Sequence, residues 1–272
     1  MTPKDEMADG IKGQAQLCFY DLRLALMVLT RLPFPAPTRE LGVGDLSRSM
    51  RFYPLIGGGV GCIAGFFLVG SSDLGLSPLA CGIIALAVAA LLTGGLHEDG
   101  LADTIDGFAG GSTKEKKLTI MRDSHIGAFG TLALIFSVGI RAAILSGMPG
   151  PGTALLGLLA AGALSRAPLA VIAIRLDPAR KDGLSGALGR PEPSHVITSV
   201  ILGSLISLLS LGFLEGGLMA VLWALLATAS VTGIVAWVAI KQIEGYTGDV
   251  MGAIQQLSEI AVLIAIGSTL AW

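Results

Sequence analysis

Long apolar runs alternate with short polar connectors along most of the chain, and about 20 mainly apolar residues suffice to cross a bilayer. Seven stretches qualify or nearly qualify as spans: 53–71, 78–96, 129–147, 153–174, 195–213, 217–240 and the shorter 258–272. An eighth, 16–34, is interrupted by charges and closed by two prolines, which favours an interfacial or re-entrant helix. The pattern predicts an all-α, polytopic membrane bundle of about seven transmembrane helices, with 1–272 as a single integral membrane domain.

Composition supports lipid as the solvent of this chain. Of its 272 residues 53% are hydrophobic and 14% are charged, which is more apolar surface than one soluble core of this length can hide. Gly57, Gly61 and Gly65 repeat at the small-xxx-small spacing that lets membrane helices pack closely. The chain has no basic stripe, so we expect no nucleic-acid partner. It carries no signal for an oligomeric state.

The basic residues are distributed unevenly between the connectors. If the spans alternate sides, sixteen of the eighteen Lys and Arg residues fall in connectors on one side, namely 1–52, 97–128, 175–194 and 241–257. The positive-inside rule then predicts that this side is cytoplasmic. The other two cations, Arg141 and Arg166, lie within spans, where we expect each to face the bundle interior and a carboxylate or an anionic ligand.

The first motif, 97–107, opens the second of these connectors and reads HEDGLADTIDG. If the helix of the preceding span continues, Asp99, Asp103 and Asp106 lie on one face and repel one another unless a cation is bound. Because Mg²⁺ tends to use a few carboxylates together with substrate phosphates, this spacing predicts a Mg²⁺ site for a diphosphate substrate. A solvated acidic loop and a cation-transport path are the alternatives. His97, beside Asp99, is a candidate substrate contact.

The second motif closes the same connector and places Arg122, Asp123, Ser124 and His125 at the membrane boundary. A guanidinium group suits phosphate oxygens bidentately, whereas an arginine in this position is otherwise an ordinary determinant of topology. The polar neighbours of Arg122 favour function. We therefore predict that these four residues bind substrate.

The third motif, 244–259, keeps polar groups where the last span should already be apolar. Asp249, Gln256 and Glu259 lie close to one helical face, and a carboxylate at the edge of a span is costly without a metal, a cation or water. The pattern predicts a second acidic cluster that faces the first, with Gln256 as a substrate contact. The alternative is ordinary snorkelling of side chains at a helix end.

Taken together, the motifs resemble those of the cobalamin synthase family, also called adenosylcobinamide-GDP ribazoletransferases. The segments that carry the resemblance are 97–107, 121–127, 245–249 and 255–259, with 29–33 and 52–57 nearer the N-terminus. They occur in order over nearly the whole chain. His125 departs from the family pattern, which has a basic arginine at this position.

The resemblance implies a bacterial inner-membrane enzyme, with its active site facing the cytoplasm, that uses Mg²⁺ to join adenosylcobinamide-GDP to α-ribazole or its 5′-phosphate. The products are adenosylcobalamin or its phosphate and GMP, and association with other cobalamin-assembly enzymes is implied as well. Under this hypothesis Asp99, Asp103 and Asp106 bind Mg²⁺ and Arg122 contacts phosphate oxygens. Asp249 or Glu259 completes a second metal site or acts as the base, and the sequence leaves that choice open.

Other membrane proteins use acidic clusters too. A CDP-alcohol phosphotransferase carries DGxxAR at the start of its motif, and here Asp99 and Gly100 are not followed by the Ala-Arg pair. The NDxxDxxxD pattern of prenyl-diphosphate transferases is also absent. A divalent-cation transporter has no need for a long connector dense with motif residues.

Overall fold

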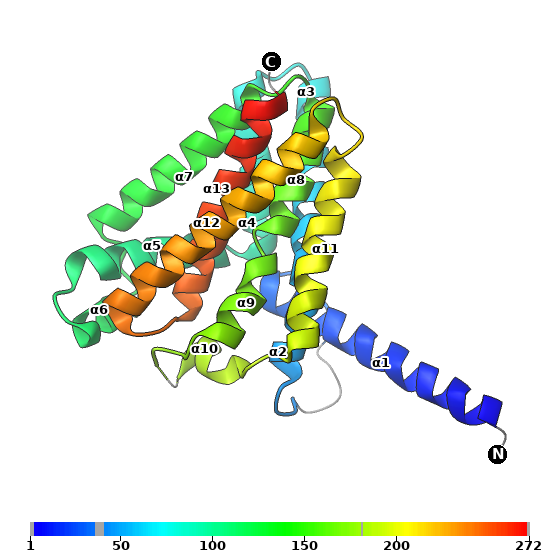
Figure 1. The fold of residues 1–272 in the computed structure, drawn as a ribbon. Helices are drawn as coiled ribbons and strands as arrows, with labels where there is room; N and C mark the ends of the chain where they lie inside the picture. The colour runs from blue at the N-terminus through cyan, green and yellow to red at the C-terminus, as the bar shows by residue number, and fades with distance from the viewer. Residues whose placement is uncertain (1–2, 36–40, 181, 271–272) are drawn as a thin grey trace.

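The computed structural model describes residues 3–35, 41–180 and 182–270, with side chains from residue 13 onward except that of Leu184, and is built from helices (Figure 1). The helices are α1 Pro3–Leu29, α2 Asp45–Ser49, η1 Met50–Phe52, α3 Tyr53–Asp73, α4 Pro78–Thr93, α5 Leu96–Gly110, α6 Lys114–Ile120, α7 Ala128–Ser146, α8 Pro151–Leu164, α9 Ala167–Arg175, α10 Gly183–Leu188, α11 Pro193–Leu211, α12 Gly217–Ile243 and α13 Gly248–Leu270. An isolated bridge between Pro178 and Tyr246 is the only β pairing among the described residues. The all-α prediction is confirmed.

Six helical stretches of the described chain are long and apolar enough to cross a membrane: Asp45–Asp73, Ala128–Ser146, Pro151–Arg175, Pro193–Leu211, Gly217–Ile243 and Gly248–Leu270. The pair of α4 and α5 passes the same test only when joined, and its two helices are bent by 92°. The predicted bundle of about seven spans is therefore confirmed, with the bent pair as its seventh member.

The helix of the predicted span 78–96 does not continue into the first motif. Helix α4 ends at Thr93, and Gly94 and Gly95 follow with φ of 66° and 68°, a left-handed conformation that residues with a Cβ rarely adopt. Helix α5 then begins afresh at Leu96 and runs across the end of α4. The break places the first motif on α5, the second helix of the bent pair, and not on a continuation of α4.

The final span also differs from its predicted range. Helix α13 begins at Gly248, ten residues before the predicted start at 258, so most of the third motif lies inside the spanning helix. The predicted span 153–174 is likewise divided, because α8 ends at Leu164 and α9 starts at Ala167 with Pro168 in its first turn. Polar side chains at these positions are tolerated because they are buried in protein rather than exposed to lipid.

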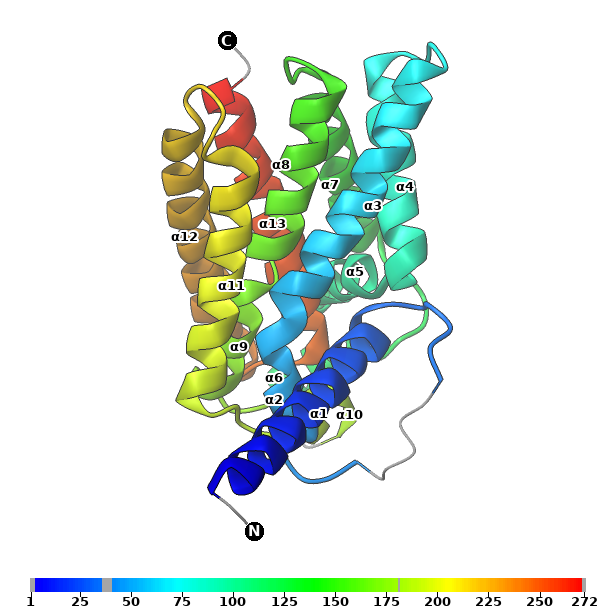
Figure 2. The same cartoon turned by 90° about the vertical axis from the view of Figure 1, so that its right-hand side faces the viewer.

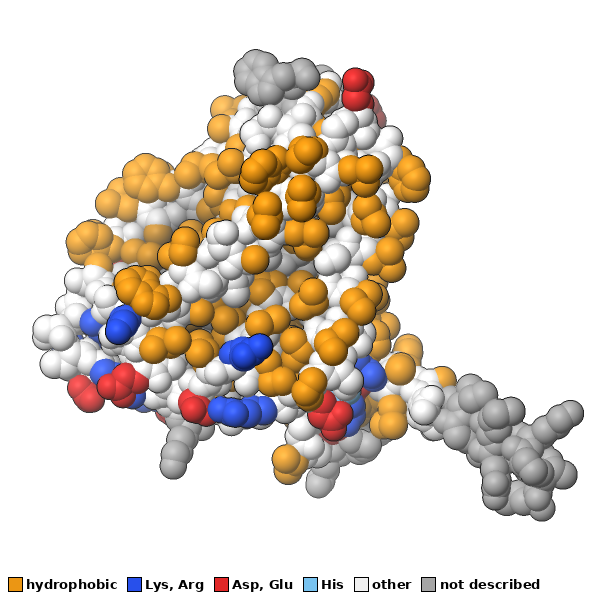
Figure 3. Space-filling model, viewed as in Figure 1, with side chains coloured by type: hydrophobic (Ala, Val, Ile, Leu, Met, Phe, Trp, Pro, Cys, Tyr) orange, Lys and Arg blue, Asp and Glu red, His pale blue; other side chains and the backbone are white. Residues whose placement is uncertain are grey.

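Burial separates central helices from peripheral ones. In the hydrophobic windows of Pro151–Arg175 and Gly248–Leu270, 78% of residues are buried, compared with 22–28% in α7, α11 and α12. Figure 3 shows the consequence, since hydrophobic side chains cover the face formed by α7, α11 and α12 while charged ones gather along its lower edge. We call that charged end, which carries α5, α6 and the segment 175–193, the motif end of the bundle.

Close helix packing occurs where the glycine spacing predicted it. On α3, a Cβ at Gly57 would overlap the carbonyl oxygen of Gly162, and one at Gly61 would overlap that of Leu158, both on α8. A Cβ at Gly65 would lie 2.6 Å from the Leu155 side chain. The backbones of α3 and α8 therefore approach too closely for any larger residue.

Helix α1 slants across the motif end of the bundle, as Figure 2 shows, and is not among the candidate spans. The carboxylate of Asp21, fully buried, accepts hydrogen bonds from Arg48 Nε at 2.9 Å and from Arg51 Nη2 at 2.6 Å. These contacts attach α1 to α2 and η1. This position agrees with the interfacial alternative for 16–34.

Candidate active site

The first and third motifs meet where α5 crosses α13. A Cβ at Gly100 would lie 2.8 Å from the carbonyl oxygen of Asp249 and 3.1 Å from the Cα of Gly252, so only glycine at position 100 permits this approach. Asp99, next to Gly100, is thereby brought to the same cavity as Asp249. Of the second acidic cluster that the third motif was predicted to form, Asp249 faces the first motif, whereas Glu259 does not line this cavity.

Two cavities adjoin Asp99. The inner cavity, of about 140 Å³, lies between α1, α3, α5, α9, α10 and α13 and includes Tyr53, His97, Asp99, Arg180 and Asp249 in its lining. The outer cavity, of about 450 Å³, is lined by residues of α5 and of the second motif, including Asp99, Asp103, Arg122, Asp123 and Ser124. The two cavities together therefore collect members of all three motifs around one exposed carboxylate.

Negative charge is in excess around Asp103. Asp103 is half-buried, and the negative charges of Asp99, Asp249 and Asp106 repel its carboxylate. The positive charge of Arg180 opposes this repulsion. A bound cation would relieve the remaining repulsion.

Asp106 is engaged elsewhere. Its Oδ2 accepts a hydrogen bond from the backbone N of Gly127 at 2.7 Å, and its Oδ1 accepts one from that of Gly130 at 2.9 Å. The carboxylate thus caps the first turn of α7, and a Cβ at either glycine would overlap it. Asp106 holds the second motif against α5, and a metal role for it stays a prediction.

The structure does not gather Asp99, Asp103 and Asp106 into one ligand set. In the part of the chain that the structure describes, no group of three or more His, Cys, Asp or Glu residues is arranged to hold a metal ion. Mg²⁺ commonly takes one or two carboxylates and completes its shell with substrate phosphates and water. Asp99 and Asp103, both on the outer cavity and mutually repelling, fit that mode of binding.

The second motif is exposed and held by weak contacts. Arg122, which lines the outer cavity, forms an ion pair with Asp182, and both side chains are more than half exposed. Asp123 Oδ1 accepts from the backbone N of His125 at 3.0 Å and lies 2.7 Å from His125 Nδ1, which lowers the pKa of Asp123. Exposed ion pairs contribute little stability, so Arg122 can exchange Asp182 for a phosphate.

Sequence reasoning missed Arg180. Its Nη2 lies 3.1 Å from Asp249 Oδ2, and its Nη1 is buried without a hydrogen-bond partner among the described residues. The backbone positions it, because Ala179 N donates to Tyr246 O at 2.8 Å and Tyr246 N donates to Asp177 O at 3.1 Å. No local motif marks Arg180, since its partner is 69 residues away.

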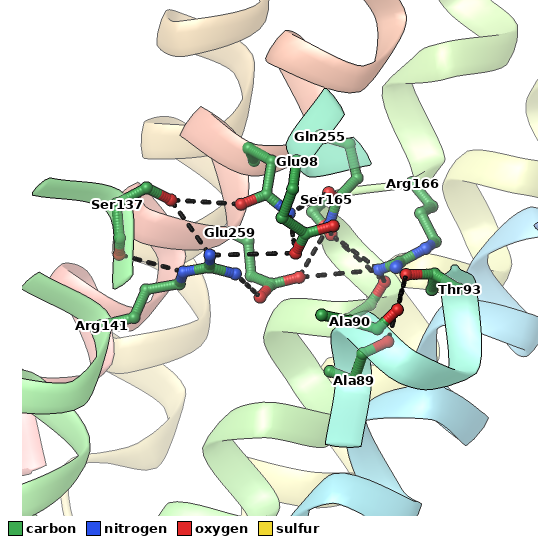
Figure 4. A network of polar contacts seen from close by, with 12 residues as sticks. Ala89, Ala90, Thr93, Glu98, Ser137, Arg141, Ser165, Arg166, Gln255 and Glu259 are labelled. Carbon is green, nitrogen blue, oxygen red and sulfur yellow. Dashed lines mark hydrogen bonds and ion pairs between the residues drawn. The ribbon is translucent and has the colours of Figure 1, made fainter. Parts of the chain in front are cut away.

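Deeper in the bundle, two arginines share one carboxylate (Figure 4). Arg141 Nη1 lies 2.8 Å from Glu259 Oε1, and Arg166 Nη1 lies 3.7 Å from Glu259 Oε2. The expectation that Arg141 and Arg166 face the interior and meet a carboxylate is confirmed. Amide groups extend this network, because Gln255 Nε2 donates to Glu259 Oε2 at 2.7 Å and Gln256 Nε2 donates to Glu98 Oε1 at 3.0 Å.

This network separates Glu259 and Gln256 from the cavities beside Asp99. Glu259 and Gln256 line neither the inner nor the outer cavity, and both oxygens of Glu259 are occupied by protein donors. His97 is buried between the two regions, and its Nε2 has no hydrogen-bond partner among the described residues. Direct substrate contact by Gln256 and base chemistry by Glu259 stay predictions, whereas Asp249 lies at the inner cavity.

The family model and the individual relatives that match this chain agree with one another. Residues 21–267 match the model of a family described as cobalamin-5-phosphate synthase. Proteins named adenosylcobinamide-GDP ribazoletransferase are similar to this chain: that of Azorhizobium caulinodans is 41% identical over 90% of this chain and 94% of its own length, and that of Bradyrhizobium diazoefficiens is 41% identical over 90% and 92%. The Brucella canis protein of that name is 39% identical over 89% and 94%. No solved structure matches the chain.

Proposed function

The chain belongs to the cobalamin-5-phosphate synthase family, and from this premise we propose that it is an adenosylcobinamide-GDP ribazoletransferase of the membrane. It joins adenosylcobinamide-GDP to α-ribazole or α-ribazole 5′-phosphate and releases GMP. The observation that carries this proposal is the meeting of Asp99, Asp103 and Asp249 at two adjoining cavities that also hold arginines.

The reaction exchanges a phosphoanhydride bond for a phosphate ester. A ribose hydroxyl that is free in both α-ribazole and its 5′-phosphate attacks the phosphate attached to cobinamide, a new O–P bond forms, and the anhydride P–O bond to the leaving GMP breaks. Arg180, whose buried Nη1 has no hydrogen-bond partner within the described part of the chain, and Arg122, with its exposed ion pair, bind the phosphate oxygens. Of the two bases considered from sequence, Asp249 lines the inner cavity, and we assign it the hydroxyl proton.

We further propose that Asp99 and Asp103 hold Mg²⁺ together with the substrate diphosphate. When bound, the ion neutralises the charge that develops on the transferred phosphate and on the leaving GMP. Support comes from the repulsion around Asp103, which a divalent cation would remove. The protein itself contributes the two carboxylates and holds them on α5 by packing Gly100 against α13.

The protein reconstituted in lipid should release GMP and form the corrinoid product only when both substrates and Mg²⁺ are present. Both products are measured by chromatography of the same reaction. Absence of product from folded protein, combined with electrogenic cation flux in vesicles, would replace this proposal by a transport function. Product formation that persists in excess chelator would contradict the requirement for Mg²⁺ but not the proposed reaction.

Asp103→Asn should lower kcat by roughly 100-fold or more, because the amide removes a negative charge that the bound cation needs. The matched control is Asp73→Asn, which makes the same change at an exposed position at the opposite end of α3. The measurement is the steady-state rate of GMP release at saturating Mg²⁺. Equal rates in the two variants would contradict a role for Asp103.

Arg180→Gln should reduce kcat/KM for the GDP-activated substrate roughly 10- to 100-fold, since a charge-assisted hydrogen bond to phosphate contributes about 1.5–3 kcal/mol. Arg190→Gln is the control, because it removes an exposed arginine of the same connector that pairs with Asp177. Kinetics with varied adenosylcobinamide-GDP distinguish the two variants. A loss of similar size in both would show that Arg180 has no special contact with the substrate.

A further inference from the structure

A second cavity of about 450 Å³ opens on the outer face of the bundle, among α9, α11 and α12 and apart from the residues assigned to the reaction. It is an apolar groove whose lining includes Pro168, Val171, Val200, Leu225, Ala229 and Gly233. Figure 1 shows α11 and α12 diverging from their connection toward the motif end, with α9 between their lower parts. The groove occupies the space that α9 leaves unfilled.

Small residues on α12 keep this groove open. Gly233, Ala229 and Ala236 line it where a larger side chain would fill it, and a Cβ built at Gly233 meets no atom within 4 Å. Packing within a membrane bundle normally uses glycine for close helix contact, as α3 and α8 do. Gly233 makes no such contact, so its small size serves the groove and not the fold.

The groove has the position and length of one lipid chain. Its walls α11 and α12 are candidate spans whose residues are mostly exposed on the outside of the bundle, so the opening faces the bilayer interior. From Leu225 to Ala236 it runs roughly 16 Å along α12 at 1.5 Å per residue. That length is about half of the ~30 Å hydrocarbon core, which is the thickness of a single leaflet.

A cation stands at the motif end of the groove. Arg175, the last residue of α9, is part of the lining and is exposed. It has no hydrogen-bond or ion-pair partner among the described residues. Arginines near the ends of spanning helices extend to the level of the lipid head groups, and basic pockets between such helices bind anionic ones.

We propose that this groove binds one anionic phospholipid from the leaflet at the motif end, with an acyl chain along α12 and the phosphate on Arg175. The planar guanidinium is suited to phosphate oxygens, and the apolar lining is suited to hydrocarbon. The site is independent of the proposed reaction, because its residues line neither the inner nor the outer cavity.

The role of the Arg175 charge is tested with protein in nanodiscs that contain equal amounts of phosphatidylglycerol and phosphatidylcholine. The protein is then released from the nanodiscs, and the lipid that it retains is identified by native mass spectrometry. The wild-type protein should retain one phosphatidylglycerol. Arg175→Gln should reduce its preference for phosphatidylglycerol over phosphatidylcholine about fivefold, the effect of one cation near the head groups. Arg175→Lys should keep most of the preference. Lys241→Gln, which changes an exposed cation of α12 outside the groove, should keep all of it.

The position of the acyl chain is tested by filling the groove with a larger side chain. Gly233→Leu should abolish retention of the lipid, whereas Gly139→Leu, at another open helix surface on α7, should not. Equal retention in wild type and Arg175→Gln, or equal loss in both leucine variants, would overturn the proposal. Retention of phosphatidylcholine as strong as that of phosphatidylglycerol would overturn it as well. A dimer that Gly233→Leu dissociates would also overturn it, because a second copy of the protein would then occupy the groove.

Discussion

At the scale of single residues, Glu259 is the counter-ion for two buried arginines. Its side chain is 10% exposed and those of Arg141 and Arg166 are 3% exposed. Isolated charges in such a position are costly, but breaking a buried pair by removing one partner leaves an uncompensated charge. The carboxylate therefore matters to the fold whatever it contributes to the reaction.

Glu259→Gln should lower the free energy of unfolding by about 3–5 kcal/mol, because Arg141 and Arg166 lose their shared negative charge. The measurement is the midpoint of thermal unfolding in detergent, followed by size-exclusion chromatography. Lys114→Gln is the control, since it breaks the exposed ion pair with Glu244 and should change the midpoint little. Similar shifts in both variants would show that the buried network adds no stability.

At the scale of elements, the site depends on one helix crossing. Helix α5 is short, lies across the end of α4, and is held by α13 through Gly100 and by α7 through Asp106. These contacts, and not the continuation of a span, orient Asp99 and Asp103. A change that separates α5 from α13 should therefore disturb the acidic residues without touching them.

Gly100→Ala should destabilise the protein by about 1–3 kcal/mol and reduce kcat, because the added methyl group forces α5 away from the backbone of Asp249. Gly139→Ala provides the same substitution in α7 where a Cβ meets no neighbour. Thermal midpoints and GMP release are compared for both variants. Unchanged activity in Gly100→Ala would mean that the crossing is not needed to position the carboxylates.

At the scale of the whole molecule, the motif end carries the basic connectors and the opposite end carries almost no charge. We propose that the motif end faces the cytoplasm of a bacterial cell, in accord with the positive-inside rule. A cysteine placed at Leu74 or Glu215, both exposed in the connectors of the opposite end, should react with an impermeant maleimide in intact spheroplasts. A cysteine at Ser112 should react only after permeabilisation, and the reverse pattern would invert the topology. The native cysteines are first replaced by alanine.

The sequence by itself determined the class of molecule, the approximate spans and the motifs. These follow from local properties, because the length of an apolar run and the spacing of carboxylates can be read within one window of the chain. It also led to the interior orientation of Arg141 and Arg166, since a charge within a span has no acceptable position in contact with lipid. The small-residue spacing on α3 likewise predicted a close contact without naming α8 as its partner.

Only the tertiary structure decided which polar groups share a cavity. Arg180 meets Asp249 across 69 residues and Arg141 meets Glu259 across 118, and no local pattern encodes either pairing. The same is true of Asp106, whose spacing matches that of Asp99 and Asp103 although its oxygens bind the first turn of α7. Helical periodicity places side chains on one face of their own helix, but what that face meets depends on the packing of all the others.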